Sequence, residues 1–570
     1  MRLRAFLGVL AFSLVLAPFS YAVDYQEKWV YHSTNLLTDK NIDDTIALMK
    51  DARASGCTHM LLDDWKFGHL GLMEKHYFEN VARLKAAAGE IGIKIIPAIY
   101  PIGYSGSYLR LDPNLAAGIP VKDAPFVVKG GFALPDPSSV PAVANPGFDQ
   151  AQGDRLTGWT LQDFPGERTF VDKTTKHSGE ASLKMTNLNT IPAELAGHCR
   201  VMQVLKTRPF QYYRLSVWTK TDGLNSEEAQ VTLLSQNEKR THCFKKFGIK
   251  PTEDWTKHEV VFNTLEASEI QMYVGLWGAT KGTIWWDDLK VEPAGLLNVL
   301  RADLSPLKVT SADGSVACEE GKDFRPVADP RLGENDYAID HEPPVLTLAD
   351  NSRIKSGDKL LVSYFHPAVI YDDQVTCSVQ NPKIFDLMED QMKRMTQLWG
   401  APGYFMSYDE IRVGGWEIQP GGARLTPGQF LAKHIARGVE IAHKYAPAAA
   451  LYVWSDMFDP YHNARPAAKG GFYYLVNGTW DGSWEGLPKD VVVCTWISQA
   501  ESLKWFAGRG NRQIMAGYYD GPVRPNIEAW MKASKGVPNI IGMMYTTWRS
   551  NYKDLPDFFA LLSKYPNWRE

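Results

Sequence analysis

The chain has 570 residues, enough for three or four domains of about 150 residues each or for one large domain with insertions. Hydrophobic residues make up 45% of it and charged residues 22%, so large cores can form and a wholly disordered chain is excluded. The 61 basic and 65 acidic residues give a net charge of −4 without long runs of one sign, which argues against a nucleic-acid partner.

The first 22 residues have the pattern of a secretory signal peptide. Arg2 and Arg4 form a basic start, residues 5–19 are an apolar run, and Ser20-Tyr21-Ala22 is a small-x-small cleavage site. The alternative is an uncleaved membrane anchor, although the run is short for a span. We therefore expect a secreted or periplasmic protein whose mature chain has no membrane span.

Six cysteines lie in the rest of the chain: Cys57, Cys199, Cys243, Cys318, Cys377 and Cys494. None belongs to a CxxC pair, so we expect no zinc or redox centre, no other metal and no cofactor. Cys199 with Cys243 and Cys318 with Cys377 are candidates for disulfides in an oxidising compartment. The first and last of the six lie in or beside apolar strand-like runs, and we expect buried thiols there.

Short apolar segments alternate with segments of helical periodicity at both ends of the chain. The expected strands are residues 29–33, 60–64, 94–100, 404–411, 451–456, 491–497, 513–519 and 540–548. The expected helices are residues 42–54, 75–91, 383–399, 427–445, 499–508, 526–535 and 555–563. This alternation is typical of parallel βα units, and eight strands are the number in a (β/α)8 TIM barrel. The alternative is an open doubly wound sheet, but no GxGxxG turn follows the first strand.

The residues between the third and fourth strands form an insertion of mainly β character. It opens with Asn145-Pro-Gly-Phe-Asp149 and its middle part closes with a strand that carries Asp287-Asp288. These motifs resemble the family 4/9-type carbohydrate-binding modules, which are β-sandwiches. A further β-rich stretch follows, with a segment at 360–366 that is a possible ninth barrel strand. The expected organisation is a signal peptide (1–22), barrel strands one to three (23–135), a carbohydrate-binding-like β-sandwich (140–295), a small β-rich connector (296–375) and barrel strands four to eight (376–570).

In a (β/α)8 barrel the reacting groups stand at the C-terminal ends of the strands. The polar and aromatic residues expected there to bind substrate are His32, Asp63, Asp64, Trp65, Tyr408, Trp454, Asp456, Trp496, Tyr518, Tyr519 and Trp548. Aromatic rings stack on the apolar faces of pyranoses, and carboxyl groups supply the acid and the nucleophile of glycoside hydrolysis. This mixture predicts a sugar site.

The adjacent acids Asp409 and Glu410 are the most specific feature. Repulsion and desolvation raise the pKa of one carboxyl in such a pair, and a glutamic acid with a raised pKa suits a general acid at neutral pH. The alternative is structural: Asp409 caps the next segment, and Glu410 forms a salt bridge with Arg412.

An Asp-Glu pair after barrel strand four resembles the family 20 glycoside hydrolases, the β-N-acetylhexosaminidases. The resemblance implies Glu410 as the acid/base, Asp409 as the residue that orients the substrate's 2-acetamido group, and Tyr518 or Tyr519 as its helper. It also implies a pocket wall of Trp454, Trp496 and Trp548. The chain departs from the family at residues 405–408, where Phe-Met-Ser-Tyr stands in place of His-x-Gly-Gly.

We therefore expect a secreted glycoside hydrolase that cleaves a poly- or oligosaccharide with Glu410 as general acid, by substrate assistance if the sugar carries a 2-acetamido group. One alternative is a retaining mechanism in which Glu410 acts with Asp520 or Asp456 as the protein nucleophile. Another is a catalytically inactive barrel protein that binds carbohydrate.

Overall fold

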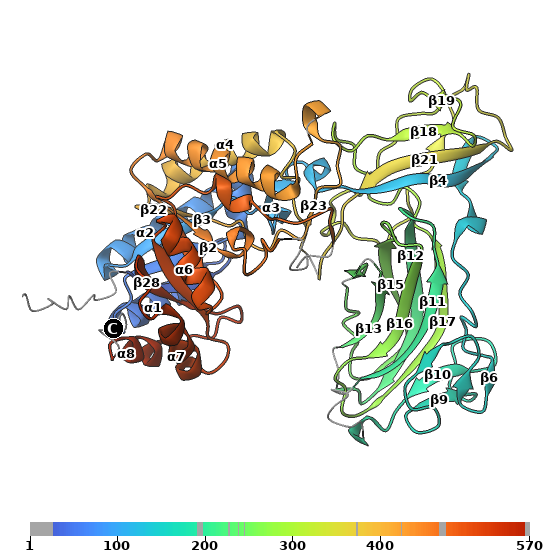
Figure 1. Ribbon diagram of the computed structural model, residues 1–570, viewed down its shortest axis with the longest axis horizontal. Coiled ribbons are helices and arrows are strands. Elements are labelled where there is room, and N and C mark those ends of the chain that lie inside the picture. Colours follow the sequence, from blue (N-terminus) through green and yellow to red (C-terminus); the bar gives the residue numbers. More distant parts are fainter. Residues whose placement is uncertain are drawn as a thin grey trace, which may run out of the picture.

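The computed structural model describes residues 27–190, 198–225, 228–237, 239–243, 245–371, 374–422, 424–466 and 475–564. The segment interpreted as a signal peptide lies outside these residues. Among the described helices, none is long and apolar enough to cross a membrane. The barrel and its helices form one lobe in Figure 1, and two β-rich parts form the rest of the molecule.

Eight parallel strands close into a barrel in which the first strand pairs with the last. The strands, in barrel order, are β1 (Glu27–Ser33), β2 (His59–Asp63), β3 (Lys94–Ile99), β22 (Gly403–Met406), β24 (Ala450–Trp454), β26 (Val492–Thr495), β27 (Gln513–Tyr518) and β28 (Ile540–Thr546). All eight coincide with segments expected from the sequence. The segment expected as a possible ninth strand, β21 (Lys359–His366), pairs elsewhere.

Helices connect most of these strands and cover the outside of the barrel. They are α1 (Asp39–Ala54), α2 (Lys75–Ile91), α4 (Lys383–Trp399), α5 (Pro427–Tyr445), α6 (Ala500–Arg509), α7 (Val523–Ser534) and α8 (Leu555–Leu562). The sequence marks several ends: Thr426 and Gln429 form a capping box before α5, and Gly92 ends α2 at a φ of 79°.

The strands are almost continuously apolar because both of their faces are buried. In β2, Met60 and Leu62 pack in the core shared with the helices, whereas Leu61 lies in the core inside the barrel. The inner core also contains Trp29 and Phe405, so side chains fill the interior of the barrel.

Two five-stranded antiparallel sheets share one core and form a β-sandwich. One sheet consists of β15 (Glu253–Asn263), β12 (Tyr212–Asp222), β17 (Thr283–Pro293), β10 (Ser182–Met185) and β9 (Thr169–Asp172). The other consists of β14 (Arg240–Thr241), β13 (Ala229–Ser235), β16 (Glu269–Leu276), β11 (Cys199–Lys206) and β8 (Leu161–Gln162). A short hairpin, β6 (Ala151–Gln152) with β7 (Arg155–Leu156), precedes them.

A six-stranded sheet lies above the sandwich in Figure 1. Its strands are β19 (Ala317–Cys318), β18 (Lys308–Ser311), β21, β4 (Ile119–Lys129), β5 (Phe132–Pro135) and β20 (Leu346–Thr347). The hairpin β4–β5 falls in the segment 23–135 that the sequence analysis placed in the barrel, but β4 pairs with β21 over most of its length. The connector sheet is therefore built from residues on both sides of the sandwich.

All six cysteines are described, and all six are free thiols. Cys57 and Cys494 are buried, as expected. The two disulfides considered from the sequence are absent: Cys199 and Cys243 both lie in the sandwich core without forming a bond.

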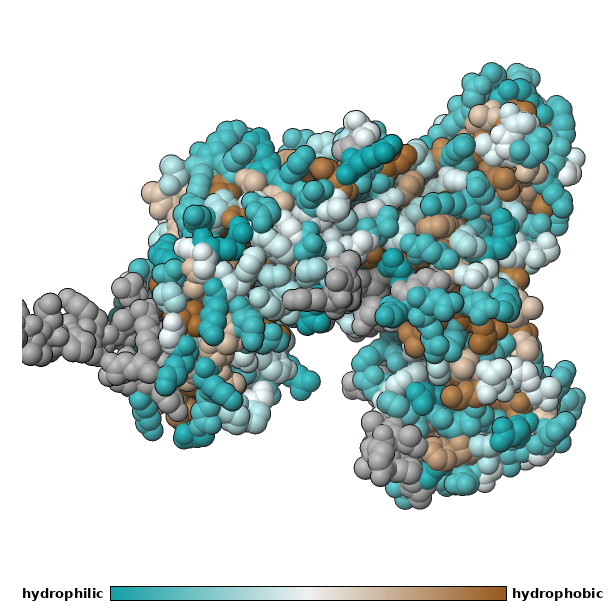
Figure 2. Space-filling model, viewed as in Figure 1, coloured by the Kyte–Doolittle hydropathy of each residue, from teal (hydrophilic) through white to brown (hydrophobic). Residues whose placement is uncertain are grey.

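The surface in Figure 2 is mainly hydrophilic, and an open gap separates the lower part of the barrel lobe from the sandwich. The connector sheet and loops of the barrel bridge the two parts. One such contact joins Arg240 of β14 to the barrel side, where its guanidinium donates to the Val476 carbonyl at 3.2 Å and lies 5.3 Å from the Trp416 ring.

Candidate active site

A cavity of about 550 Å³ opens at the C-terminal ends of the barrel strands. It is lined by Tyr31, Leu61, Asp63, Trp65, Ala98, Pro101, Tyr104, Ser107, Ser407, Asp409, Glu410, Trp454, Asp456, His462, Trp496 and Trp548. Four of these residues are acids and none is lysine or arginine. We call this space the barrel cavity. Eight of the fourteen site residues predicted from the sequence line it, and the other six lie outside.

Asp456 lies deepest among the acids. It begins the short helical turn η7 (Asp456–Phe458) directly after β24, and only 3% of its surface is exposed. Its Oδ2 atom accepts hydrogen bonds from the Glu410 backbone N–H at 2.8 Å and from Asn463 Nδ2 at 2.9 Å, whereas Oδ1 is buried without a hydrogen-bond partner. Burial raises the pKa of this carboxyl to about 7, so it holds a proton much of the time near neutral pH.

Asp409 follows β22 and is partly exposed to the cavity. Burial, and then the negative charges of Asp456 and Glu410, raise its pKa well above the usual range. At the end of β2, burial and the charge of Asp64 raise the pKa of Asp63 to about 6. Asp409 and Asp456 are therefore two carboxyl groups of one cavity whose pKa values are both raised, and the charge of Asp456 is one cause of the shift at Asp409.

Glu410 has different surroundings although it is the next residue. Arg412 Nη2 lies 2.8 Å from its Oε1 atom, and the Tyr104 hydroxyl donates to Oε2. Gln374 Nε2 donates to the Glu410 backbone oxygen at 2.9 Å, and the residue has a φ of 50°, uncommon for a side chain other than glycine. These contacts hold the Glu410 carboxyl group in place at the cavity wall.

Three tryptophans from the ends of β24, β26 and β28 make the aromatic wall. The Trp454 ring centroid lies 5.8 Å from that of Trp496 and 6.3 Å from that of Trp548, and the last two are 5.3 Å apart. Trp548 is 50% exposed, and Trp65, on the other side of the cavity, is 52% exposed. Exposed indoles beside carboxyl groups match the requirements of a pyranose, which has apolar faces and hydroxyl edges.

Three other predicted site residues have structural partners instead. The His32 ring is buried between the Tyr552 hydroxyl at 2.7 Å and the Thr45 hydroxyl at 2.9 Å. Asp64 accepts from the backbone N–H groups of Leu36 and Lys66 and from the Tyr77 hydroxyl, at 3.0, 3.1 and 3.0 Å. The Tyr408 hydroxyl is buried and lies 3.0 Å from His434 Nδ1.

The predicted residues after β27 also lie outside the barrel cavity. Tyr519 is buried, and its ring stacks on that of Tyr545 at 4.8 Å. Asp520 Oδ1 accepts from the Thr547 hydroxyl at 2.5 Å and Oδ2 from the Trp548 backbone N–H at 2.8 Å. Asp520 therefore holds the loop that carries Trp548. Tyr518 is 40% exposed in a neighbouring hollow.

Sequence reasoning missed Tyr104 and His462, which both line the barrel cavity. Tyr104 comes four residues after the third expected strand, and an aromatic residue so close to a strand end was a usable signal. His462 comes six residues after Asp456, and no sequence pattern distinguishes it from a loop histidine. Among the described residues, no group of three or more His, Cys, Asp or Glu side chains is arranged to hold a metal ion.

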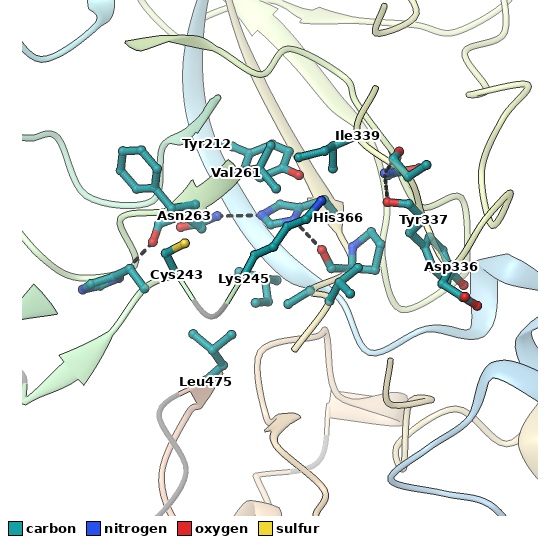
Figure 3. Close-up of a pocket in the computed structure, with 18 of the residues that line it drawn as sticks. Tyr212, Cys243, Lys245, Val261, Asn263, Asp336, Tyr337, Ile339, His366 and Leu475 are labelled. Atoms are coloured by element: carbon teal, nitrogen blue, oxygen red, sulfur yellow. Dashed lines mark hydrogen bonds between the residues drawn. The ribbon is translucent and has the colours of Figure 1, made fainter. Parts of the chain in front are cut away.

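A second, smaller cavity of about 110 Å³ lies at the junction of the sandwich, the connector and a barrel loop (Figure 3). The His366 ring stacks on Tyr212 with centroids 3.6 Å apart and lies 3.0 Å from Asn263 Nδ2 and 2.8 Å from the Pro367 carbonyl. Burial lowers the pKa of His366 to about 4, so its ring is neutral, donates from Nδ1 and accepts at Nε2. We call this space the junction cavity, because its lining residues connect the sandwich, the connector and a barrel loop.

No protein-family model matches the chain, and no curated protein matches it. Solved structures with partial likeness include a rhamnosidase from Novosphingobium sp. PP1Y, at 10% identity over 97% of this chain and 59% of that one, with a TM-score of 0.33. Another is a GH20 exo-β-N-acetylglucosaminidase from Vibrio harveyi, at 14% identity over 34% and 32%, with a TM-score of 0.22. A third is TmCBM61 in complex with β-1,4-galactotriose, at 17% identity over 27% and 98%, with a TM-score of 0.21.

Proposed function

We propose that this protein is a glycoside hydrolase and that the barrel cavity is its active site. One observation carries the proposal: the cavity combines two carboxyl groups of raised pKa, Asp409 and Asp456, with a Glu410 carboxylate paired with Arg412 and a wall of tryptophans. Glycoside hydrolysis requires one protonated and one ionised carboxyl group beside the scissile bond, and these surroundings support both.

Asp409 is the proton donor in this proposal. It is more exposed to the cavity than Asp456, and its proton passes to the glycosidic oxygen as the bond from that oxygen to the anomeric carbon breaks. Glu410 supplies the negative charge, as the nucleophile that attacks the anomeric carbon or as the base that activates a water molecule. Asp456 is a positioning residue, since it binds the Glu410 backbone N–H and raises the pKa of Asp409.

This division differs from the roles expected from the sequence, in which Glu410 was the acid, Asp409 oriented a 2-acetamido group, and Asp520 or Asp456 was the alternative nucleophile. Glu410 already pairs with the Arg412 guanidinium and accepts from the Tyr104 hydroxyl, which suits the charged partner of the reaction better than the proton donor. The substrate-assisted scheme has less support, because Tyr518 and Tyr519 do not line the barrel cavity. Asp520 as nucleophile also has less support, because Thr547 and Trp548 occupy its oxygens.

We also propose a (β/α)8 barrel with an inserted carbohydrate-binding-like sandwich, with the connector extended to include residues 119–135. The pairing of β4 with β21 supports that boundary. Secretion or export to the periplasm rests on residues 1–22 alone.

The test uses aryl glycosides of neutral and 2-acetamido pyranoses with two leaving groups, phenol and 2,4-dinitrophenol. If Asp409 is the acid, Asp409→Asn loses about a thousandfold in kcat/KM on phenyl glycosides and far less on dinitrophenyl glycosides, which need no protonation. Glu410→Gln loses activity on both. The reverse pattern would restore the sequence-based assignment of Glu410 as acid.

A second function, a carbohydrate-binding barrel without catalysis, is favoured by one observation: Arg412 and Tyr104 hold the Glu410 carboxylate from two sides. In that case the parent protein releases no phenol from any of these glycosides, while its tryptophan fluorescence still responds to the sugars.

A further inference from the structure

A second hollow adjoins the barrel cavity and shares two of its tryptophans. It has a volume of about 380 Å³ and is lined by Trp496, Ser498, Tyr518, Asn526, Trp530 and Trp548. Trp496 and Trp548 line both spaces, so the pair of rings stands between them. We infer that this aromatic hollow is a second sugar-binding subsite, which takes the next neutral pyranose of the glycan whose scissile bond lies in the barrel cavity.

The shared wall is held in place before any ligand arrives. Trp548 is half-exposed, but its loop is fixed. The Asp520 carboxylate accepts hydrogen bonds from the Thr547 hydroxyl and from the Trp548 backbone N–H. The Tyr31 ring supports the indole on the barrel side at a centroid distance of 5.0 Å. A large aromatic side chain fixed in an exposed position loses little conformational entropy on binding, which is what a stacking platform requires.

The far side of the wall offers hydrogen-bonding groups as well as rings. Tyr518 ends β27 and is 40% exposed, and Ser498 lies beyond the end of β26. Asn526, on α7, also lines the hollow. Hydroxyl and amide groups among the rings can exchange hydrogen bonds with the hydroxyl groups of a sugar.

The lining also indicates the class of ligand. None of the six residues carries a charge, so a sugar carboxylate or sulfate would find no cation there and would lose its hydration. The volume falls within the range of small-molecule pockets, and the shared indoles make the space continuous with the barrel cavity. The occupant that fits both facts is a neighbouring neutral unit of the same glycan. This inference rests on the proposed function, because that function places a glycan in the barrel cavity.

The test measures how affinity depends on chain length. Asp409→Asn protein, which holds substrate without turnover, is titrated by tryptophan fluorescence with neutral α- and β-linked gluco-, N-acetylgluco-, xylo-, galacto-, manno- and rhamno-oligosaccharides of one to four units. We expect the affinity for the best sugar to rise about tenfold or more from one unit to two, because the second unit gains stacking and a hydrogen bond. Tyr518→Ala and Asn526→Ala, added separately, each reduce that ratio.

The matched control is Glu528→Ala, which removes an exposed side chain from the same helix outside the hollow. It leaves the ratio of disaccharide to monosaccharide affinity unchanged. An unchanged ratio in the Tyr518 and Asn526 variants, no gain from the second unit, or no binding of any neutral oligosaccharide would overturn the subsite.

Turnover of the same oligosaccharides by the parent protein separates this inference from the proposed function. If the affinity rises with chain length as expected but no reducing ends are released, the subsite is supported and the proposed hydrolase activity is contradicted. If the oligosaccharides are cleaved but the ratio of disaccharide to monosaccharide affinity is unchanged in the variants, the subsite is contradicted and the hydrolase activity is supported.

Discussion

The barrel cavity and the junction cavity differ in how their polar groups are paired. In the junction cavity, His366 accepts from Asn263, donates to the Pro367 carbonyl and stacks on Tyr212, so the fold itself satisfies the ring (Figure 3). In the barrel cavity, Asp456 Oδ1 has no hydrogen-bond partner and four acids crowd one space. Carboxyl groups of raised pKa that crowd one space mark a place for chemistry, whereas a ring whose partners all belong to the fold marks a structural contact.

The largest expected effect on kcat/KM comes from substituting an acid of the barrel cavity, and the matched control is an acid of the junction cavity. Glu410→Gln in the barrel cavity should lower kcat/KM by about a thousandfold or more, because the reaction loses its charged carboxylate. Asp336→Asn in the junction cavity should change kcat/KM less than about twofold, since asparagine keeps the shape and tolerates the φ of 56° there. Equal losses in the two variants, measured by steady-state kinetics, would end the distinction.

Asp456→Asn tests the coupling inside the barrel cavity. Without the negative charge of Asp456 the pKa of Asp409 falls, so the donor loses its proton at lower pH. We expect the basic limb of the kcat/KM profile to move to lower pH by about one unit, which is about tenfold in activity at pH 8.

The control for this shift is Asp459→Asn. Burial raises the pKa of Asp459 to about 6, but its side chain does not line the cavity. Its profile should keep the parent's basic limb, and a basic limb that stays in place in Asp456→Asn would contradict the coupling. Thermal melts add a second check. The raised pKa of Asp456 contributes stability that is complete below about pH 4 and is lost as the pH rises through about 7, so Asp456→Asn should melt at a higher temperature than the parent at pH 8.

Asp520→Asn should have a smaller effect, because we propose that Asp520 positions Trp548. Asparagine retains one acceptor for the Trp548 loop and loses the other, so kcat/KM should fall only several-fold. A loss of about a thousandfold, with formation of a glycosyl azide when azide is added, would instead identify Asp520 as the nucleophile.

The smallest effect on activity is expected at the junction. His366→Phe keeps the stack on Tyr212 and removes the titrating ring, and it should leave kcat/KM within about twofold of the parent. The lowered pKa of His366 contributes stability present above pH 6.5 and lost as the pH falls through about 4, amounting to about 3 kcal/mol. Urea unfolding at pH 4 and pH 7 should therefore show a smaller difference in the variant than in the parent, and an identical difference would contradict this role.

Much of the barrel followed from local patterns. Strand β2 and helices α2, α4 and α5 begin and end within one residue of their predicted bounds, because apolar runs, capping residues and glycines mark them in the chain. The hairpin β4–β5 was misplaced because its partner, β21, lies more than 220 residues further on. No local pattern reports which distant strand a hairpin will pair with.

The sequence predicted where the candidate site lies but not what each of its residues contacts. Polar and aromatic residues at strand ends identified Asp63, Asp409, Asp456 and the three tryptophans. The same rule also selected His32, Asp64 and Tyr519, whose side chains turn into the structure around the cavity. The direction of a side chain just past a strand end depends on the turn that follows, and that turn is shaped by neighbouring strands.

The alternation of strands and helices, the β-rich insertion and the acids and tryptophans at the strand ends can all be read from the chain, because periodicity and composition are local properties. The different surroundings of the carboxyl groups arise only when the chain folds. Asp409 and Glu410 are neighbours in the chain, yet Asp456 approaches one from β24 while Arg412 and Tyr104 bind the other. A pKa depends on desolvation and on nearby charges, and both are set by residues that folding brings together.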